Sequence, residues 1–495
     1  MKTQDLSPQT GSAFSGIWGV SAAIWGIIAL VLIALPLRVI SYGYLPDDDA
    51  LRHAAKAISG KPWTEILVMR PEITIDHNQG WHWILAWVHH MTNWHAETLV
   101  LFSVIAMFVI CAGSALPWLK RPEAWLLSLA LLMVIFPYFA ARVLLGRPLL
   151  LTMAITITLL CMWSERAEKE ASRTTFMVTI LLFAVAALVH GAWYLLVLIP
   201  AAFLLARAWG KALHLTFCWI IGSCLGALLT GTPWTFLTQS VLTPFLALGM
   251  NVPPECLVRE LRPFNGGLPA MLVIAAILVA RRITGRPLST LLLDPVFWLA
   301  LGGWLLGFRV ARFWLDWGLP AIALWLAKEI QYLLQMKMPR NSWGGVAVSA
   351  LAAVILFFVA GSDRNARWSQ YGRIDCLDQT RPEHAGWVPE PGGVLYSVDL
   401  SVFYETFFRN PAGDWRYVLG FEPSLMRAED LDVYEELCHT RNAIKACAPW
   451  VKRMTLADRF LLLGPPQTKP AFPDLQWKYV ANGTWVGRLP RIDKP

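Results

Sequence analysis

Long apolar runs separated by short polar connections dominate the first three quarters of the chain. A helix that crosses a bilayer needs about 17–25 predominantly apolar residues, and runs of comparable length recur up to residue 361. The pattern predicts spans at 17–39, 97–118, 123–140, 146–163, 174–190, 191–207, 213–231, 269–283, 291–308, 313–333 and 345–361. We therefore expect a polytopic α-helical membrane protein with about eleven to thirteen transmembrane helices.

The stretch 81–95 is apolar but short for a span. His82, His89 and His90 give it a polar face, so we expect an amphipathic helix at the outer membrane interface. The alternative is that 81–118 divides into two spans.

Charge in the connections predicts the orientation. Lys and Arg cluster in alternate connections, which the positive-inside rule assigns to the cytoplasm: Lys120/Arg121, Arg166/Lys169/Arg173, Arg207/Lys211, Arg281/Arg282/Arg286 and Lys328/Lys337/Arg340. The outer loops 41–96 and 232–268 and the C-terminal part 362–495 then face the other side.

The composition supports a membrane protein. The chain is 56% hydrophobic and only 15% charged, against about 25% charged residues in an ordinary soluble domain. Basic loops facing anionic lipid account for the net charge of +8, so we expect membrane lipids and no nucleic acid as partners.

The composition changes after Gly361, which divides the chain into a transmembrane domain, 1–361, and a polar C-terminal domain, 362–495. Strand-like stretches at 393–398 and 459–463 alternate with a helical stretch at 428–438. We expect a small α+β domain outside the membrane.

The eight cysteines fall into two groups. Four lie in apolar segments and are interpreted as small buried hydrophobic residues: Cys111, Cys161, Cys218 and Cys224. Four lie in polar stretches and are disulfide candidates if these face an oxidising compartment: Cys256, Cys376, Cys438 and Cys447. Nearness in sequence favours Cys438 with Cys447.

Three consecutive carboxylates, Asp47, Asp48 and Asp49, follow the first apolar segment. One aspartate would suffice to cap a helix, and acidic side chains at a membrane boundary are costly unless they meet water, a metal or a reaction. We therefore interpret the cluster as a functional site, with capping as a secondary role for one member.

Further polar residues from distant parts of the chain fall on the same predicted face. They are Glu72, Asp76 and His77 in the first outer loop, Arg142, Arg147 and His190 at the ends of spans, Glu255, Arg259 and Arg262 in the second outer loop, and Arg309 and Arg312 at the end of a later span. A carboxylate can act as general base, and arginine binds phosphate oxygens bidentately. The combination suits transfer of a group from a lipid-linked phosphate.

The chain resembles the GT-C superfamily of membrane glycosyltransferases, which use polyprenyl- or dolichyl-phosphate sugars and include protein mannosyltransferases and lipid A aminoarabinose transferases. The resemblance rests on the acidic start of the first outer loop (Asp48-Asp49-Ala-Leu-Arg-His-Ala-Ala-Lys-Ala-Ile-Ser-Gly60), the aromatic segment Gly80-Trp-His-Trp-Ile-Leu, Gly146-Arg147-Pro148 after Phe136-Pro137-Tyr138, and the C-terminal soluble domain. The chain lacks the WWDYG-type acceptor motif of oligosaccharyltransferases. The sequence FWLDWG around Asp316 is only loosely similar to that motif.

The resemblance implies a catalytic base or metal ligand at Asp48 or Asp49, and Asp47 is the third candidate. It implies a lipid-phosphate site at Arg309 and Arg312, then Arg142 and Arg147, and a second acidic position at Asp76. Asp76, His77 and His190 are candidates for metal or acceptor binding. A divalent ion, Mg²⁺ or Mn²⁺, is left open.

The expected function is transfer of a sugar from a polyprenyl-phosphate donor to a lipid, glycan or protein acceptor, by single displacement with inversion. We expect a multi-pass protein of the bacterial inner membrane with a periplasmic C-terminal domain. The alternatives are a flippase of lipid-linked glycans, a glycan polymerase or ligase, and a purely structural subunit. Spans nearly free of central charge disfavour the flippase.

Overall fold

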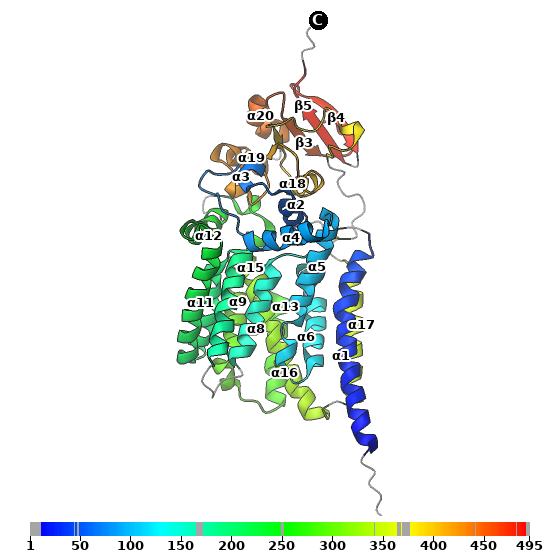
Figure 1. The fold of residues 1–495 in the computed structure, drawn as a ribbon, viewed down its shortest axis with the longest axis vertical. Coiled ribbons are helices and arrows are strands. Elements are labelled where there is room, and N and C mark those ends of the chain that lie inside the picture. Colours follow the sequence, from blue (N-terminus) through cyan, green and yellow to red (C-terminus); the bar gives the residue numbers. More distant parts are fainter. Residues whose placement is uncertain are drawn as a thin grey trace, which may run out of the picture.

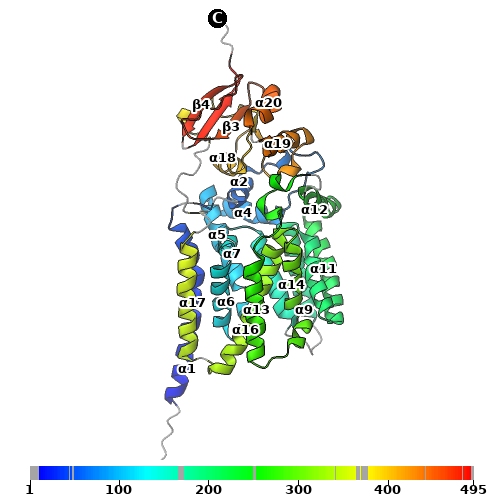
Figure 2. The ribbon, with the colours of Figure 1, turned by 180° about the vertical axis from the view of Figure 1, so that it is seen from behind.

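The computed structural model describes residues 11–43, 45–46, 49–164, 172–248, 252–340, 342–363, 368, 377–440, 442–481 and 483–491. A bundle of roughly parallel helices carries a smaller domain with a β-sheet at one end (Figure 1). We call this end of the bundle the sheet end. The view from behind shows the same two-part arrangement (Figure 2).

Each predicted span falls on helical structure. The helices of the bundle and its connections are α1 (Gly11–Ile40), α5 (Ala96–Gly113), α6 (Pro122–Ile135), α7 (Pro137–Leu144), α8 (Leu149–Ser164), α9 (Arg173–His190), α10 (Leu198–Leu205), α11 (Trp209–Leu229), α12 (Pro233–Ala247), α13 (Gly267–Ile283), α14 (Pro295–Gly307), α15 (Ala311–Phe313), α16 (Leu319–Lys337) and α17 (Trp343–Gly361).

Fewer helices than predicted are long and apolar enough to cross a membrane on their own. Among the described residues five pass: 19–40, 96–118, 173–190, 209–229 and 343–361. A sixth passes if α6 and α7 form one span, although the two are bent by 116° where Pro137 interrupts the predicted helix 123–140. Three shorter apolar helices accompany them. The predicted eleven to thirteen spans therefore remain a prediction.

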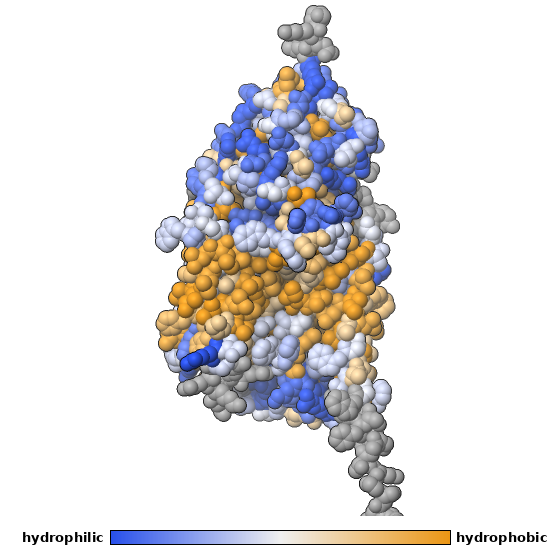
Figure 3. Space-filling view, in the orientation of Figure 1, coloured by the Kyte–Doolittle hydropathy of each residue, from blue (hydrophilic) through white to orange (hydrophobic). Residues whose placement is uncertain are grey.

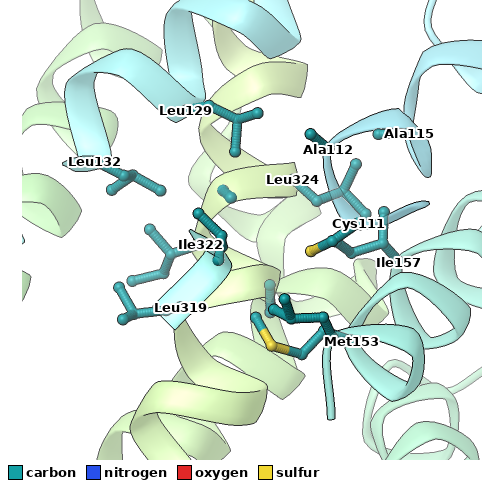
Figure 4. Close-up of a cluster of buried hydrophobic side chains, with 14 of the residues drawn as sticks. Cys111, Ala112, Ala115, Leu129, Leu132, Met153, Ile157, Leu319, Ile322 and Leu324 are labelled. Atoms are coloured by element: carbon teal, nitrogen blue, oxygen red, sulfur yellow. The ribbon is translucent and has the colours of Figure 1, made fainter. Parts of the chain in front are cut away.

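Apolar side chains cover the outside of the bundle as well as its core. In Figure 3 they form a band between the polar C-terminal domain and a polar patch at the opposite end. Inside, side chains of α5, α6, α8 and α16 interlock, among them Cys111, Leu129, Met153 and Leu324 (Figure 4). These are the features of an α-helical membrane protein that carries a small α+β domain.

Helices α9 and α11 pack unusually closely through two glycines. A Cβ atom at Gly222 would lie 2.5 Å from the carbonyl oxygen of Ile180, and one at Gly226 would lie 2.6 Å from that of Ala184. Small residues four apart are a common contact between membrane helices, because they let two backbones approach.

The predicted amphipathic helix is α4 (Gln79–Thr92), which lies across the sheet end in Figure 1 rather than along the bundle. One face buries Trp81 and Leu85, whereas the other exposes Trp83, Trp87 and Met91. The helix is present, but the predicted polar face is not: His82 lies on the buried face, only His90 of the three histidines is exposed, and the outward side chains are mostly aromatic or apolar.

The C-terminal sheet has five strands in the order β2-β1-β3-β5-β4. The strands are β1 (Val394–Tyr396), β2 (Arg416–Tyr417), β3 (Arg459–Leu463), β4 (Gln476–Ala481) and β5 (Thr484–Arg488). Strand β1 pairs in parallel with β2 and β3, and the remaining pairs are antiparallel. Helices α18 (Leu400–Arg409), α19 (Ala428–Thr440) and α20 (Ala443–Arg453) accompany the sheet, so the α+β prediction is confirmed.

The first outer loop packs against this sheet. It contains α2 (Asp49–Ser59) and α3 (Trp63–Ile66), and Leu67 then forms a parallel bridge with Tyr417. The amide of Val68 donates to the carbonyl oxygen of Tyr417 at 2.9 Å. One hydrophobic cluster includes residues from both segments: Trp63, Ile66, Leu67, Phe403, Phe407 and Tyr417. The sheet and the loop thus share a core and border the same site.

Candidate functional site

A cavity of about 420 Å³ lies at the sheet end, between the bundle and the C-terminal domain. Its polar lining comes from segments that are far apart in the sequence: Arg52, His53, Asp76, His77, Asn78, His190, Tyr194, Arg312, Asp316 and Glu422. Its apolar lining includes Pro244, Phe245, Ala247 and Leu248 at the end of α12, and Phe421 and Leu425 of the C-terminal domain. The lining is therefore mixed, with an apolar stretch at the end of α12.

Asp49 opens α2 and is held by three groups. Its Oδ1 lies 3.0 Å from Nη2 of Arg52 and accepts a hydrogen bond from the hydroxyl of Tyr404 at 2.9 Å. Its Oδ2 lies 3.7 Å from Nε of Arg147. Burial would raise the pKa of Asp49, but Arg52, Arg147 and the tyrosine outweigh it and hold that pKa well below the ordinary value. Asp49 is therefore ionised and engaged.

Glu260 joins three arginines and was missed in the sequence. Its Oε1 lies 2.5 Å from Nη1 of both Arg142 and Arg147, and its Oε2 lies 3.6 Å from Nε of Arg312. Burial opposes ionisation, yet these arginines lower the pKa of Glu260 far below its usual range. Only its position in the second outer loop, beside the candidates Glu255 and Arg259, pointed to this residue.

Asp316 completes the network from within the bundle. It lies in a π-helical turn, Trp314–Gly318, a kind of turn that is frequent at functional sites. Arg142 donates from Nε to its Oδ1 at 3.0 Å and also from Nη2. Arg142 is 5% exposed and does not line the cavity. Its charge is neutralised inside the protein by Glu260 and Asp316.

The predicted lipid-phosphate arginines differ in their surroundings. Arg312 lines the cavity, and its Nε is the atom nearest to both Glu260 and Asp316, at 3.6 and 3.7 Å. Among the described residues its two terminal nitrogens have no hydrogen-bond partner, so they can bind an anion in the cavity. Arg309 is exposed and does not line the cavity. Arg147 pairs with Glu260 and Asp49, away from the cavity lining.

His77 and His190 both line the cavity, as their prediction as ligand-binding residues requires. Each has a buried ring nitrogen without a hydrogen-bond partner, Nε2 in His77 and Nδ1 in His190. Burial lowers the pKa of His77 to about 4, against the opposing effect of Asp76. Gly191 brings the two segments together: its φ is +54°, and a Cβ atom there would lie 2.7 Å from the carbonyl oxygen of His77.

Asp76 is bonded to a pair of histidines that sequence reasoning did not select. His82 Nδ1 lies 2.6 Å from Oδ2 of Asp76, and His82 Nε2 lies 2.8 Å from Nδ1 of His53. Lys56 is 4.0 Å from the same carboxylate oxygen. His82 was noticed only for the amphipathic pattern of its helix, and the spacing of the three residues gives no sign that they meet.

No disulfide joins the described cysteines, and they are arranged differently from the predicted pairing. Cys438 lies beside Cys256 of the second outer loop, close enough for the two thiols to share a hydrogen bond. Burial first and then Cys438 raise the pKa of Cys256 to about 12. Cys447 is fully buried in the core around Trp450, whereas Cys438 is half-buried. Cys376 lies outside the described residues.

Two of the three predicted catalytic aspartates, Asp47 and Asp48, also lie outside the described residues. Within the described ranges, no group of three or more His, Cys, Asp or Glu side chains is arranged to hold a metal ion. Asp49 is engaged by two arginines and Asp76 by His82 and Lys56. The divalent ion stays a prediction, and no step below uses one.

The chain matches no protein-family model, and no curated protein matches it.

Proposed function

We propose that the protein is a membrane glycosyltransferase that moves a sugar from a polyprenyl-phosphate donor to a hydroxyl or amine acceptor. The observation that carries this proposal is Arg312, a guanidinium group in the lining of a cavity that also has an apolar stretch at the end of α12. A guanidinium group binds phosphate oxygens bidentately and stays charged at every physiological pH. It can therefore hold the phosphate of a donor and stabilise the phosphate that leaves.

The apolar residues at the end of α12 support the proposal that the donor is linked to a lipid. Phe245 lines the cavity and is also 60% exposed, so this wall continues to the surface of the protein. Pro244, Ala247 and Leu248 extend the apolar wall. An isoprenoid chain could run along it from the membrane while its phosphate reaches Arg312.

In the proposed reaction the acceptor oxygen attacks the anomeric carbon as the bond to the phosphate oxygen breaks. The configuration inverts, the acceptor loses a proton to a base in the cavity, and polyprenyl phosphate leaves with the electron pair. The C-terminal domain borders this space through Phe421 and Glu422, so it would contact the acceptor. We propose the periplasmic side of a bacterial inner membrane as the location.

The test is sugar transfer by the purified protein from a panel of radiolabelled polyprenyl-phosphate sugars. Arg312→Ala should reduce the transfer rate by about 10²–10³-fold, the usual loss when one stabilising charge is removed from a reaction centre. Arg309→Ala is the matched control, because Arg309 lies three positions away, is exposed and does not line the cavity. Donor binding without transfer, or translocation of the donor across a vesicle, would contradict the proposal.

A further inference from the structure

Three side chains form a hydrogen-bonded chain that reaches the cavity. Asp76 Oδ2 contacts His82 Nδ1 at 2.6 Å, and His82 Nε2 contacts His53 Nδ1 at 2.8 Å. The two histidines come from α4 and α2 and are 5% and 2% exposed. His53, the last member of the chain, lines the cavity.

The carboxylate at one end fixes one proton of the chain. An ionised carboxylate can only accept, so Nδ1 of His82 carries the proton that it donates to Asp76. In the state where this is the only proton on His82, its Nε2 accepts and His53 donates to it from Nδ1. That state leaves Nε2 of His53 without a proton, as an acceptor.

The surroundings favour this state of the chain. Burial lowers the pKa of His53 well below its ordinary value, and Arg52 acts in the same direction against Asp49 and Asp76. The ring is therefore neutral at pH 7. Burial would raise the pKa of Asp76, but the hydrogen bond from His82 and the charge of Lys56 at 4.0 Å lower it, so Asp76 remains ionised.

We propose that Nε2 of His53 accepts the proton of the acceptor group, and that His82 and Asp76 are positioning residues that hold its tautomer. This inference rests on the proposed glycosyl transfer, which requires a base in the cavity. Asp49, one of the two aspartates expected from the sequence to act as base, is less suited, because Arg52, Arg147 and Tyr404 occupy its oxygens; the other, Asp48, lies outside the described residues.

Every proton in the step has a destination. As the acceptor oxygen bonds to the anomeric carbon, its proton moves to Nε2 of His53. The Nδ1 proton of His53 can then move to Nε2 of His82, while Nδ1 of His82 keeps its proton and its hydrogen bond to the ionised Asp76. The positive charge is shared along the chain, and Asp76 compensates it, as the acidic member of a catalytic triad does.

Nitrogen-15 NMR of histidine-labelled protein tests the tautomer without any substrate. We expect His53 to be protonated at Nδ1 and unprotonated at Nε2 near pH 7 in the wild type. In Asp76→Asn the amide can donate as well as accept, so the His53 signals should become those of a tautomer mixture. A wild-type His53 that carries its proton on Nε2 would overturn the proposal, whether or not any variant folds.

Transfer kinetics test the role. His53→Gln should lower kcat by about 10²–10⁴-fold, the range for general acid–base catalysis, with the KM for donor unchanged. His82→Gln should lower kcat less and alter its pH profile, because the base loses its fixed tautomer. The matched control is His90→Gln, on the same helix as His82 and exposed to solvent.

The outcomes separate the two proposals. Wild-type rates in His53→Gln, from an enzyme that transfers sugar, would overturn the role of His53 and leave the proposed function in place. A wild type that transfers from no polyprenyl-phosphate donor would overturn both.

Discussion

Glu260 is the residue on which the arginines of the site depend. It contacts Arg142, Arg147 and Arg312, whereas Asp316 contacts Arg142 and Arg312. Without Glu260, the guanidinium groups of these three arginines would lose a shared counter-ion at a site that little water reaches, and they would repel one another. Glu260 is therefore expected to stabilise the fold as well as to arrange the site.

Replacing Glu260 by Gln should destabilise the fold by about 3 kcal/mol, the lower end for breaking a buried ion pair. The thermal midpoint of the purified protein in detergent measures this loss. Glu255→Gln is the control, because Glu255 lies in the same loop with an exposed side chain. Equal midpoints for the two variants would show that the network contributes nothing to stability.

Acid should destabilise the protein in two stages. The pKa of His77 is lowered to about 4 and that of His53 is also lowered, so the unfolded chain binds more protons than the folded one as the pH falls below about 6.5. Asp76 and Glu260 have lowered pKa values and lose their contribution as the pH falls below about 4. Thermal midpoints measured from pH 7 to pH 3 should fall throughout, and the first stage should shrink in His77→Gln. A midpoint that stays constant from pH 7 to pH 4.5 would contradict the histidine assignment.

Single residues show what the sequence could and could not predict. Arg312, Asp76, His77 and His190 were assigned to one face from loop charges alone, and all four line the cavity. His53 and Glu260 were not selected as site residues, and His82 was named only for the amphipathic pattern, because their roles depend on which loop residues meet after folding. Arg142 and Arg309 were grouped with Arg312 by position, and only the structure distinguishes a buried, an exposed and a cavity-facing guanidinium group.

At the scale of elements, the apolar runs predicted helix positions well and helix continuity less well. The predicted span 123–140 breaks at Pro137 into two helices bent by 116°. The predicted span 191–207 begins with a 3-10 turn, Trp193–Val197, before α10. A hydropathy pattern identifies apolar segments, but it does not indicate where a helix breaks or bends within them.

The contact between α9 and α11 can be tested through its glycines. Gly222→Ala should lower the thermal midpoint, because the new Cβ would lie 2.5 Å from a backbone carbonyl oxygen and force the helices apart. The control is Gly210→Ala on the same helix, where a Cβ would meet nothing within 4 Å. If both variants unfold at the wild-type temperature, the close approach is not part of the stable fold.

The second outer loop and α19 should become linked under oxidising conditions. Cys256 and Cys438 face each other, so we expect a disulfide between them and a free thiol at the buried Cys447. Mass spectrometry of non-reduced peptides identifies the linkage. A bond between Cys438 and Cys447, the pair favoured by sequence distance, would contradict this arrangement.

At the scale of the whole molecule, the C-terminal domain belongs to the site. It supplies Tyr404 to Asp49, and Phe421 and Glu422 to the cavity, and it shares a hydrophobic cluster with the first outer loop. The sequence predicted an α+β domain but no residue through which it would act. The reason is physical: Leu67 pairs with Tyr417 across 350 positions of the chain, and no local pattern encodes such a contact.

The most direct measurement is a single turnover of the purified wild type with a polyprenyl-phosphate sugar and an acceptor, followed by the anomeric configuration of the product. We predict release of polyprenyl phosphate together with a product of inverted configuration, and a rate about 10²–10³-fold lower in Arg312→Ala. Retention of configuration, or equal rates in the two proteins, would contradict the proposed displacement at Arg312.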